Sequence, residues 1–241
     1  MELLITFLAG VSILVGALLT HILDDTERVE HASIALALGA LLSLFFFDLG
    51  PDVLEYIKNG GRMYAFLFMA GGFVLLVLLD RLVPDHEDTE TTHDHENAAH
   101  IGLIASLGII LHNIVEGMTV YSLGLVSIEN GIVFAIGIAL HNIPMGMMID
   151  STLQEHSRAR RWSVLAAVTL STLAGGILVR AFESKITEFV TGSLVAAASG
   201  MILYLVLIEL LPHVFRNKKK LPSFLFAAAG FVLVYLSCKI G

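Results

Sequence analysis

The chain of 241 residues is 56% hydrophobic and only 15% charged, whereas soluble domains carry about 25% charged residues. Its formal net charge of −8 argues against nucleic-acid binding, which requires a basic surface. The single cysteine, Cys238, excludes an internal disulfide and a cysteine-based zinc knuckle. Lipid is the simplest solvent for the excess apolar residues, so the sequence predicts an all-α, polytopic membrane protein.

Hydrophobic segments follow one another along the whole chain, and each approaches or exceeds the roughly 18–20 residues that a membrane-spanning helix needs. The first is longer than the apolar part of a signal peptide and no basic residues precede it, so we interpret it as a spanning helix. Charged or Gly/Pro-containing stretches separate the segments. The eight predicted helices are approximately 3–23, 31–57, 61–84, 98–122, 127–151, 161–182, 187–213 and 221–240.

An even number of spans places both termini on one side, and lysine and arginine indicate which side. If both termini lie outside the cytoplasm, the inner loops hold more Lys and Arg than the outer ones, largely because of the cluster from Arg216 to Lys220. We therefore predict a multi-pass protein of the cell membrane with extracytoplasmic termini. The lipid bilayer is then its first partner. The sequence does not fix the oligomeric state, and a homodimer is compatible with it.

The break at residues 85–97 is acidic, contains His86, His93 and His95, and faces the cytoplasm in this topology. Its polar composition cannot form a packed unit, so we predict one transmembrane domain over residues 1–241 and no soluble domain. The loop could collect metal on the cytoplasmic side. A solvated acidic linker without metal explains the same residues equally well.

The fourth segment contains the stretch GIILHNIVEGMTV, with ionisable side chains in the middle of a predicted spanning helix. Such side chains are costly in a membrane and therefore indicate function. His112 and Glu116 are four residues apart, so they share one helix face. Imidazole and carboxylate groups both bind zinc and neighbouring transition metals. A metal site on this face is the simplest interpretation.

The fifth segment repeats the His-Asn pair as His141 and Asn142. His112 lies about ten residues before the intervening turn and His141 about thirteen after it, so their depths differ by only about 5 Å at 1.5 Å per residue. Both lie near the midplane, where transporter sites are common. Pro144 frees a backbone carbonyl that could line a cavity. A lone histidine could merely link helices, but two such pairs at equal depth favour a shared site.

Acidic residues on two further segments are candidates for a path to and from this site. Asp48 and Asp52, four residues apart on the second segment, could form an electronegative entrance that concentrates cations. Solvated carboxylates at a helix end are the alternative. Glu209 on the seventh segment is better supported, because its neighbours are wholly apolar, and His213 follows it closely.

At these residues the chain resembles the ZIP (Zrt/Irt-like) family of divalent-metal transporters, in particular its bacterial, GufA-like branch. HNIVEG in the fourth segment matches the family's HNxxEG, and HNIPMG in the fifth resembles HNIPEG. FDLGPD at 47–52 and ELLPH at 209–213 are weaker similarities. The resemblance covers the whole chain and implies a ZIP-type bundle of eight helices with both termini outside.

Carried over residue by residue, the resemblance implies a metal bound by His112, Glu116 and His141. It implies that Asn113 and Asn142 belong to an adjoining second position in relatives that hold two metals. The residues similar to ligands on the access or exit path are Asp48, Asp52, Glu209 and His213.

Two departures from the family pattern concern negative charge. Met145 stands where the fifth-segment motif normally has Glu, and Gly175 falls where the sixth segment often has another Glu. Two adjacent dications would repel with little compensation, so we predict a single metal built on the fourth and fifth segments. Met145 is either a soft thioether ligand or, as we favour, an apolar filler.

The sequence therefore predicts transport of a divalent transition metal toward the cytoplasm by alternating access. Zinc is favoured, and iron, manganese, cobalt or cadmium are compatible. The metal is the transported substrate, and no organic cofactor is implied. Because no nucleotide-binding motif occurs, the driving force must be the ion gradient or coupling to another ion. A non-transporting metal sensor or scaffold is the main alternative. An intramembrane metalloenzyme is less favoured, because HExxH does not occur.

Overall fold

The computed structural model describes residues 1–22, 26–82, 93–154, 156–182, 186–216 and 220–239. These residues form helices joined by short connections, with no β-strand among them. The α-helices are α1 (Glu2–Thr20), α2 (Thr26–Leu44), α3 (Gly50–Tyr56), α4 (Arg62–Asp80), α5 (His93–Val126), α6 (Ile128–Thr152), α7 (Arg158–Phe182), α8 (Glu188–Tyr204), α9 (Leu211–Arg216) and α10 (Lys220–Ser237). The π-helical segments are η1 (Phe45–Leu49), η2 (Ile57–Gly61) and η4 (Leu205–Leu210).

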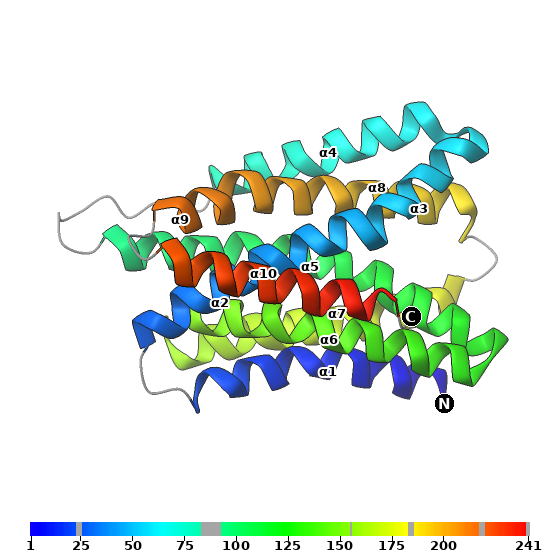
Figure 1. The fold of residues 1–241 in the computed structure, drawn as a ribbon. Coiled ribbons are helices and arrows are strands. Elements are labelled where there is room, and N and C mark those ends of the chain that lie inside the picture. Colours follow the sequence, from blue (N-terminus) through cyan, green and yellow to red (C-terminus); the bar gives the residue numbers. More distant parts are fainter. Residues whose placement is uncertain (23–25, 83–92, 155, 183–185, 217–219, 240–241) are drawn as a thin grey trace.

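Seven continuous helical stretches in the described part of the chain are long and apolar enough to cross a membrane. The stretch from Arg28 to Asp80 has 53 residues and contains a kink at Gly60, where φ is 97°. Glycine adopts this left-handed conformation readily because it has no Cβ. Figure 1 shows α2 and α3 running to this kink and α4 returning from it. The stretch thus supplies two antiparallel segments, and the predicted polytopic, all-helical fold is confirmed.

The start of α5 differs from the sequence-based expectation. The helix begins at His93 rather than near residue 98, so the end of the predicted 85–97 loop is helical. Apolar periodicity located only the membrane-like part of this helix, because a polar extension carries no such signal. Residues 85–92, with His86, lie outside the described residues, as do the side chains of His93 and His95.

The bundle consists of a central four-helix group and two flanking pairs. In the central group, α1 packs on α6 and α7, and α5 packs on the same two helices. The pair α2 and α10 lies against α6, whereas the pair α4 and α8 lies against α5. The two helices that carry the His-Asn motifs, α5 and α6, are therefore neighbours in the central group.

In each of the four most closely packed helix pairs, both helices carry a glycine at the point of contact. At Gly117 of α5, an added Cβ would lie 1.8 Å from the Thr172 carbonyl oxygen of α7, and at Gly175 of α7 it would lie 2.0 Å from the Ile114 carbonyl oxygen of α5. Small residues permit this close approach, which is typical of helices in membranes. The equivalent pairs are Gly16 with Gly146, Gly39 with Gly230, and Gly72 with Gly200.

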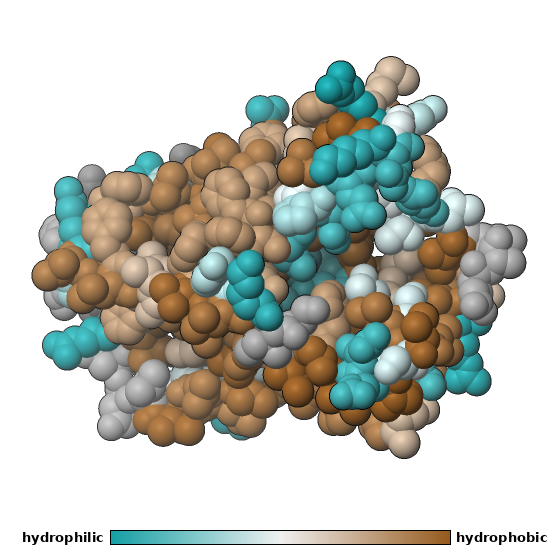
Figure 2. Space-filling model, turned by 45° about the vertical axis from the view of Figure 1, so that its right-hand side comes forward, coloured by the Kyte–Doolittle hydropathy of each residue, from teal (hydrophilic) through white to brown (hydrophobic). Residues whose placement is uncertain are grey.

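The surface is apolar around the bundle and polar at its ends. Large exposed hydrophobic side chains occur on every long helix except α2, which suits a surrounding of lipid. Figure 2 shows that hydrophilic side chains gather around a hollow in one otherwise largely apolar face. Figure 1 places the N- and C-termini at the same end of the bundle.

Candidate metal centre

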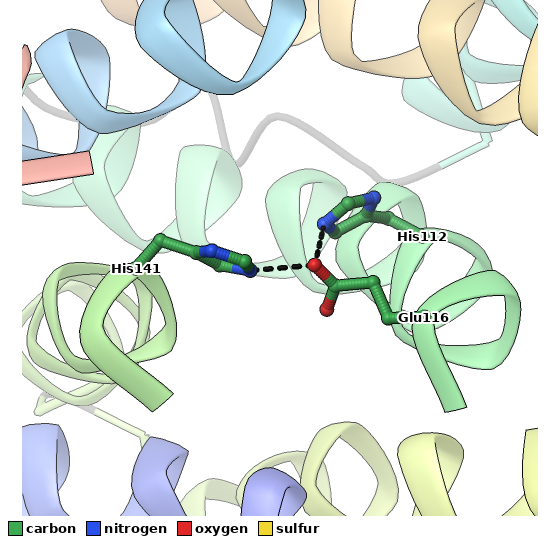
Figure 3. Close-up of side chains that lie close together, drawn as sticks. All are labelled: His112, Glu116 and His141. Carbon is green, nitrogen blue, oxygen red and sulfur yellow. Dashed lines mark ion pairs between the residues drawn. The ribbon is translucent and has the colours of Figure 1, made fainter. Parts of the chain in front are cut away.

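Three ionisable side chains meet between α5 and α6, in the interior of the bundle (Figure 3). The Oε1 atom of Glu116 lies 3.0 Å from Nε2 of His112 and 2.6 Å from Nε2 of His141. All three residues are at most 4% exposed. The helix register explains this arrangement: residues 112 and 116 share one face of α5, and the antiparallel partner brings His141 to the same depth.

The turn between the two helices fixes that depth. Ser127 separates α5 from α6 and caps α6, its hydroxyl accepting a hydrogen bond from the Asn130 amide nitrogen at 3.5 Å. With so short a connection, the helices must run side by side. His112 and His141 therefore lie at similar distances from the turn on neighbouring helices, which is the reason to expect from the sequence that they meet.

The cluster has the chemistry of a site for a divalent transition metal. It offers two imidazole nitrogens and one carboxylate, and one ligand atom from each residue lies within 4.8 Å of those of the other two. Two histidines and one carboxylate form a common ligand set for zinc. A buried carboxylate needs positive charge nearby, and a dication between these three atoms would provide it.

Asp48 lies in the π-helical segment η1 and connects this cluster to one end of the bundle. Its carboxylate interacts electrostatically with Glu116, His112 and His141. Asp52 on α3 is exposed and interacts in turn with Asp48 and with the exposed Glu55. These interactions link Asp48 to the centre and Asp52 to Asp48, in a row that leads toward the surface. The role of this row as a cation entrance stays a prediction.

The asparagines of the two motifs bond to backbone carbonyls of the other two helices in the central group. Asn113 donates its amide hydrogen to the Val168 carbonyl of α7 over 3.1 Å, and Asn142 donates to the Ala9 carbonyl of α1 over 3.4 Å. Both residues are fully buried. They face the interior of the central four-helix group, next to the His–Glu–His cluster along each helix.

The two departures from the family pattern have different structural settings. Met145 is fully buried and belongs to the main hydrophobic cluster of the bundle, together with Met148 and Ile149, a setting that favours the filler role. Gly175 lies at the contact of α7 with α5, where a side chain would collide with the Ile114 carbonyl. In this packing, position 175 has no room for a carboxylate.

A second potential ligand group lies nearer the other end of the bundle and includes Asp80, His100 and Glu209. The Nε2 atom of His100 is 2.5 Å from Oδ1 of Asp80, and the Tyr204 hydroxyl donates to Oε1 of Glu209 over 3.1 Å. Sequence reasoning found Glu209 but missed its two partners. Asp80 and His100 flank the loop between two spans, so they resembled ordinary helix-end residues.

His213 does not share this cluster, although it follows Glu209 by four residues. Its Nε2 atom lies 3.4 Å from Nδ1 of His31 at the start of α2. The π-helical segment η4 adds a residue to the turn that contains Glu209, which changes the register relative to α9.

A helical membrane bundle with two imidazoles and a carboxylate buried between its helices defines a polytopic membrane protein with a metal centre as its candidate site. The sequence profile described as ZIP zinc transporter matches residues 83–237. The zinc transporter ZupT of Chlorobium luteolum is 32% identical, covering 87% of this chain and 86% of its own length. The ZupT of Chlorobium phaeovibrioides is 33% identical with the same coverage. The zinc transporter ZTP29 of Arabidopsis thaliana is 28% identical, covering 88% and 83%.

The chain therefore belongs to the ZIP family. It is a transporter rather than an enzyme, in agreement with the absence of an HExxH motif from the sequence. Membership also confirms the family resemblance inferred from HNIVEG and HNIPMG.

Proposed function

We propose that this protein carries a divalent transition metal, zinc by preference, through a single site made by His112, Glu116 and His141. The observation that supports it is the meeting of these three buried side chains from two helices at one depth. The relatives are named as zinc transporters of bacteria and a plant, which points to the same substrate. The metal is cargo, so the site must bind and release it.

The row of Asp48 and Asp52 on one side of the centre and the group with Glu209 on the other suggest the route. Asp52 and Asp48 would collect the cation at the end that holds the termini, and Glu209 would receive it toward the opposite end. With both termini outside the cytoplasm, this route runs inward, and alternating access would expose the centre to each side in turn. The whole chain, 1–241, would act as one transport domain, with the 85–97 loop in the cytoplasm.

A single metal is favoured over two. Glu116 is the carboxylate in the cluster, Met145 supplies no charge, and the packing at Gly175 leaves no room for another side chain. One dication balanced by one carboxylate and two neutral imidazoles has a residual charge of +1. A second dication would raise that charge to +3 in a medium where charge is costly.

Uptake of radioactive zinc into proteoliposomes tests the proposal. We expect saturable uptake that falls at least about tenfold in His112→Ala and Glu116→Gln, because each change removes one of three ligands. Glu129→Gln, an exposed carboxylate in the first turn of α6, is the matched control and should transport normally. Zinc binding without uptake, unaffected by His112→Ala, would instead support the non-transporting sensor or scaffold.

A further inference from the structure

Four buried side chains beside the metal centre present oxygen atoms that lack a hydrogen-bond partner among the described residues. They are the amide oxygens of Asn113 and Asn142 and the hydroxyl oxygens of Thr169 and Thr172. Each of these residues is at most 4% exposed. An unsatisfied buried polar atom costs about 1–3 kcal/mol, so four of them in one bundle call for a ligand.

The orientation of the two amides follows from their donors. Each side-chain nitrogen is directed at a backbone carbonyl of another helix, Val168 for Asn113 and Ala9 for Asn142. The amide oxygens therefore point away from those carbonyls. The two His-Asn motifs use their asparagines in the same way, one against α7 and the other against α1.

Contacts around Gly10 of α1 link these groups through neighbouring residues of α1 and α7. An added Cβ at Gly10 would lie 3.1 Å from Oγ1 of Thr172 and 2.4 Å from the carbonyl oxygen of Thr169. Ala9, the preceding residue, accepts the Asn142 hydrogen bond. Asn113 donates to the carbonyl of Val168, the residue directly before Thr169 on α7.

Neutral amide and hydroxyl oxygens suit a hard cation of low charge. They supply dipoles but no counter-charge, and carbonyl-type oxygens coordinate Na⁺ in other transporters. The desolvation cost of an ion rises with the square of its charge, so a divalent ion is disfavoured where no carboxylate is present. Transition metals also prefer the nitrogen ligands of the adjacent cluster.

We propose that Asn113, Asn142, Thr169 and Thr172 form a Na⁺ site beside the His112–Glu116–His141 centre. Asn113 and Asn142 directly follow the two histidine ligands in the chain, so occupancy of either site affects the other. By thermodynamic linkage, the effect is reciprocal. Na⁺ would then be the coupling ion for the transport proposed above; this coupling rests on that function, whereas Na⁺ binding itself does not.

Thermal unfolding of the purified full-length chain in detergent tests Na⁺ binding, because a ligand of the folded state raises Tm. We compare NaCl with N-methylglucamine chloride at equal ionic strength. The wild type should show a Na⁺-specific rise in Tm, and Thr172→Val, which removes one oxygen at nearly constant volume, should lose it. The matched control is Thr152→Val on α6, since the Thr152 hydroxyl already donates to the Met148 carbonyl over 2.7 Å; it should keep the rise.

Equal Tm values in the two salts, or a full Na⁺ response in Thr172→Val, would overturn the proposal. If that variant does not fold, equilibrium dialysis of the wild type with ²²Na⁺ decides: about one bound Na⁺ per chain supports the site, and none overturns it. Zinc added in the same unfolding experiment reports separately on the metal centre. Loss of the zinc response with Na⁺ binding intact counts against the proposed transport function alone.

Discussion

At the scale of single residues, charge determines what the centre can hold. Glu116 is contacted by both imidazoles, and Asp48 interacts with it at longer range. Met145 occupies the position, one turn after His141, where a carboxylate would provide a second negative charge. The centre is therefore asymmetric, with its charge on α5 and a neutral contribution from α6.

Replacing Met145 with glutamate tests this asymmetry. We expect Met145→Glu to bind zinc about tenfold more tightly, a gain of about 1.4 kcal/mol, because it adds a carboxylate beside a cation. Met145→Gln has nearly the same shape without the charge and should show no gain. Isothermal titration of both variants provides the measurement. Equal affinities for wild type and Met145→Glu would contradict the explanation based on charge.

At the scale of elements, two prolines explain the two π-helical segments that carry acidic residues. Gly50, just before Pro51, donates its N–H to the Phe45 carbonyl five residues back, and Leu211, just before Pro212, donates likewise to Val206. Proline has no N–H and crowds the carbonyl four residues back, so the preceding turn widens. Asp48 and Glu209 each lie three residues before their proline and are reoriented by the wider turn.

Pro51→Ala should therefore stabilise the protein but slow transport. Proline inside a helix costs about 3 kcal/mol, so its removal should raise Tm. A regular α-helical turn would also rotate Asp48 by about 100° relative to the segment beyond it, away from the centre, and zinc uptake should fall several-fold. Pro222→Ala is the control, because the first turn of α10 requires no N–H donor there. Unchanged uptake in Pro51→Ala would show that η1 does not position Asp48 for transport.

Close packing of α4 on α8 offers a matched pair of glycines for a second test at this scale. An added Cβ at Gly72 would lie 2.1 Å from the Ala197 carbonyl oxygen, whereas at Gly71 it would meet nothing within 4 Å. Both alanine substitutions raise helix propensity equally. We expect Gly72→Ala to lower stability by about 1–3 kcal/mol and Gly71→Ala to leave it the same or higher, as measured by thermal unfolding in detergent.

If Gly72→Ala proves as stable as Gly71→Ala, the four glycine pairs would not be what sets the helix spacing. The pairs recur in the central group and in both flanking pairs. If Gly72→Ala instead lowers stability strongly, we expect similar losses from alanine at the other three glycine pairs.

At the scale of the whole molecule, the sequence predicted the helices and the principal cluster but not the contacts between distant segments. His112, Glu116 and His141 could be grouped because they lie on one hairpin, where spacing alone sets depth. Asp80 and His100 could not be joined to Glu209, since that contact depends on how α4 and α8 pack. The reorientation of His213 toward His31 likewise requires the π-helical turn, which leaves no periodic signal in the sequence.

The orientation of the whole bundle in the membrane can be tested at its two ends. Exposed Lys58 lies by the kink at Gly60, at the end of the bundle that carries both termini, and exposed Arg160 lies in the first turn of α7 at the opposite end. In a Cys238→Ser background, we expect a membrane-impermeant maleimide to label Lys58→Cys in intact cells. Arg160→Cys should be labelled only after permeabilisation, because the excess of basic residues holds that end in the cytoplasm. The reverse pattern would place the row of Asp48 and Asp52 on the cytoplasmic side, where it could collect metal only for export.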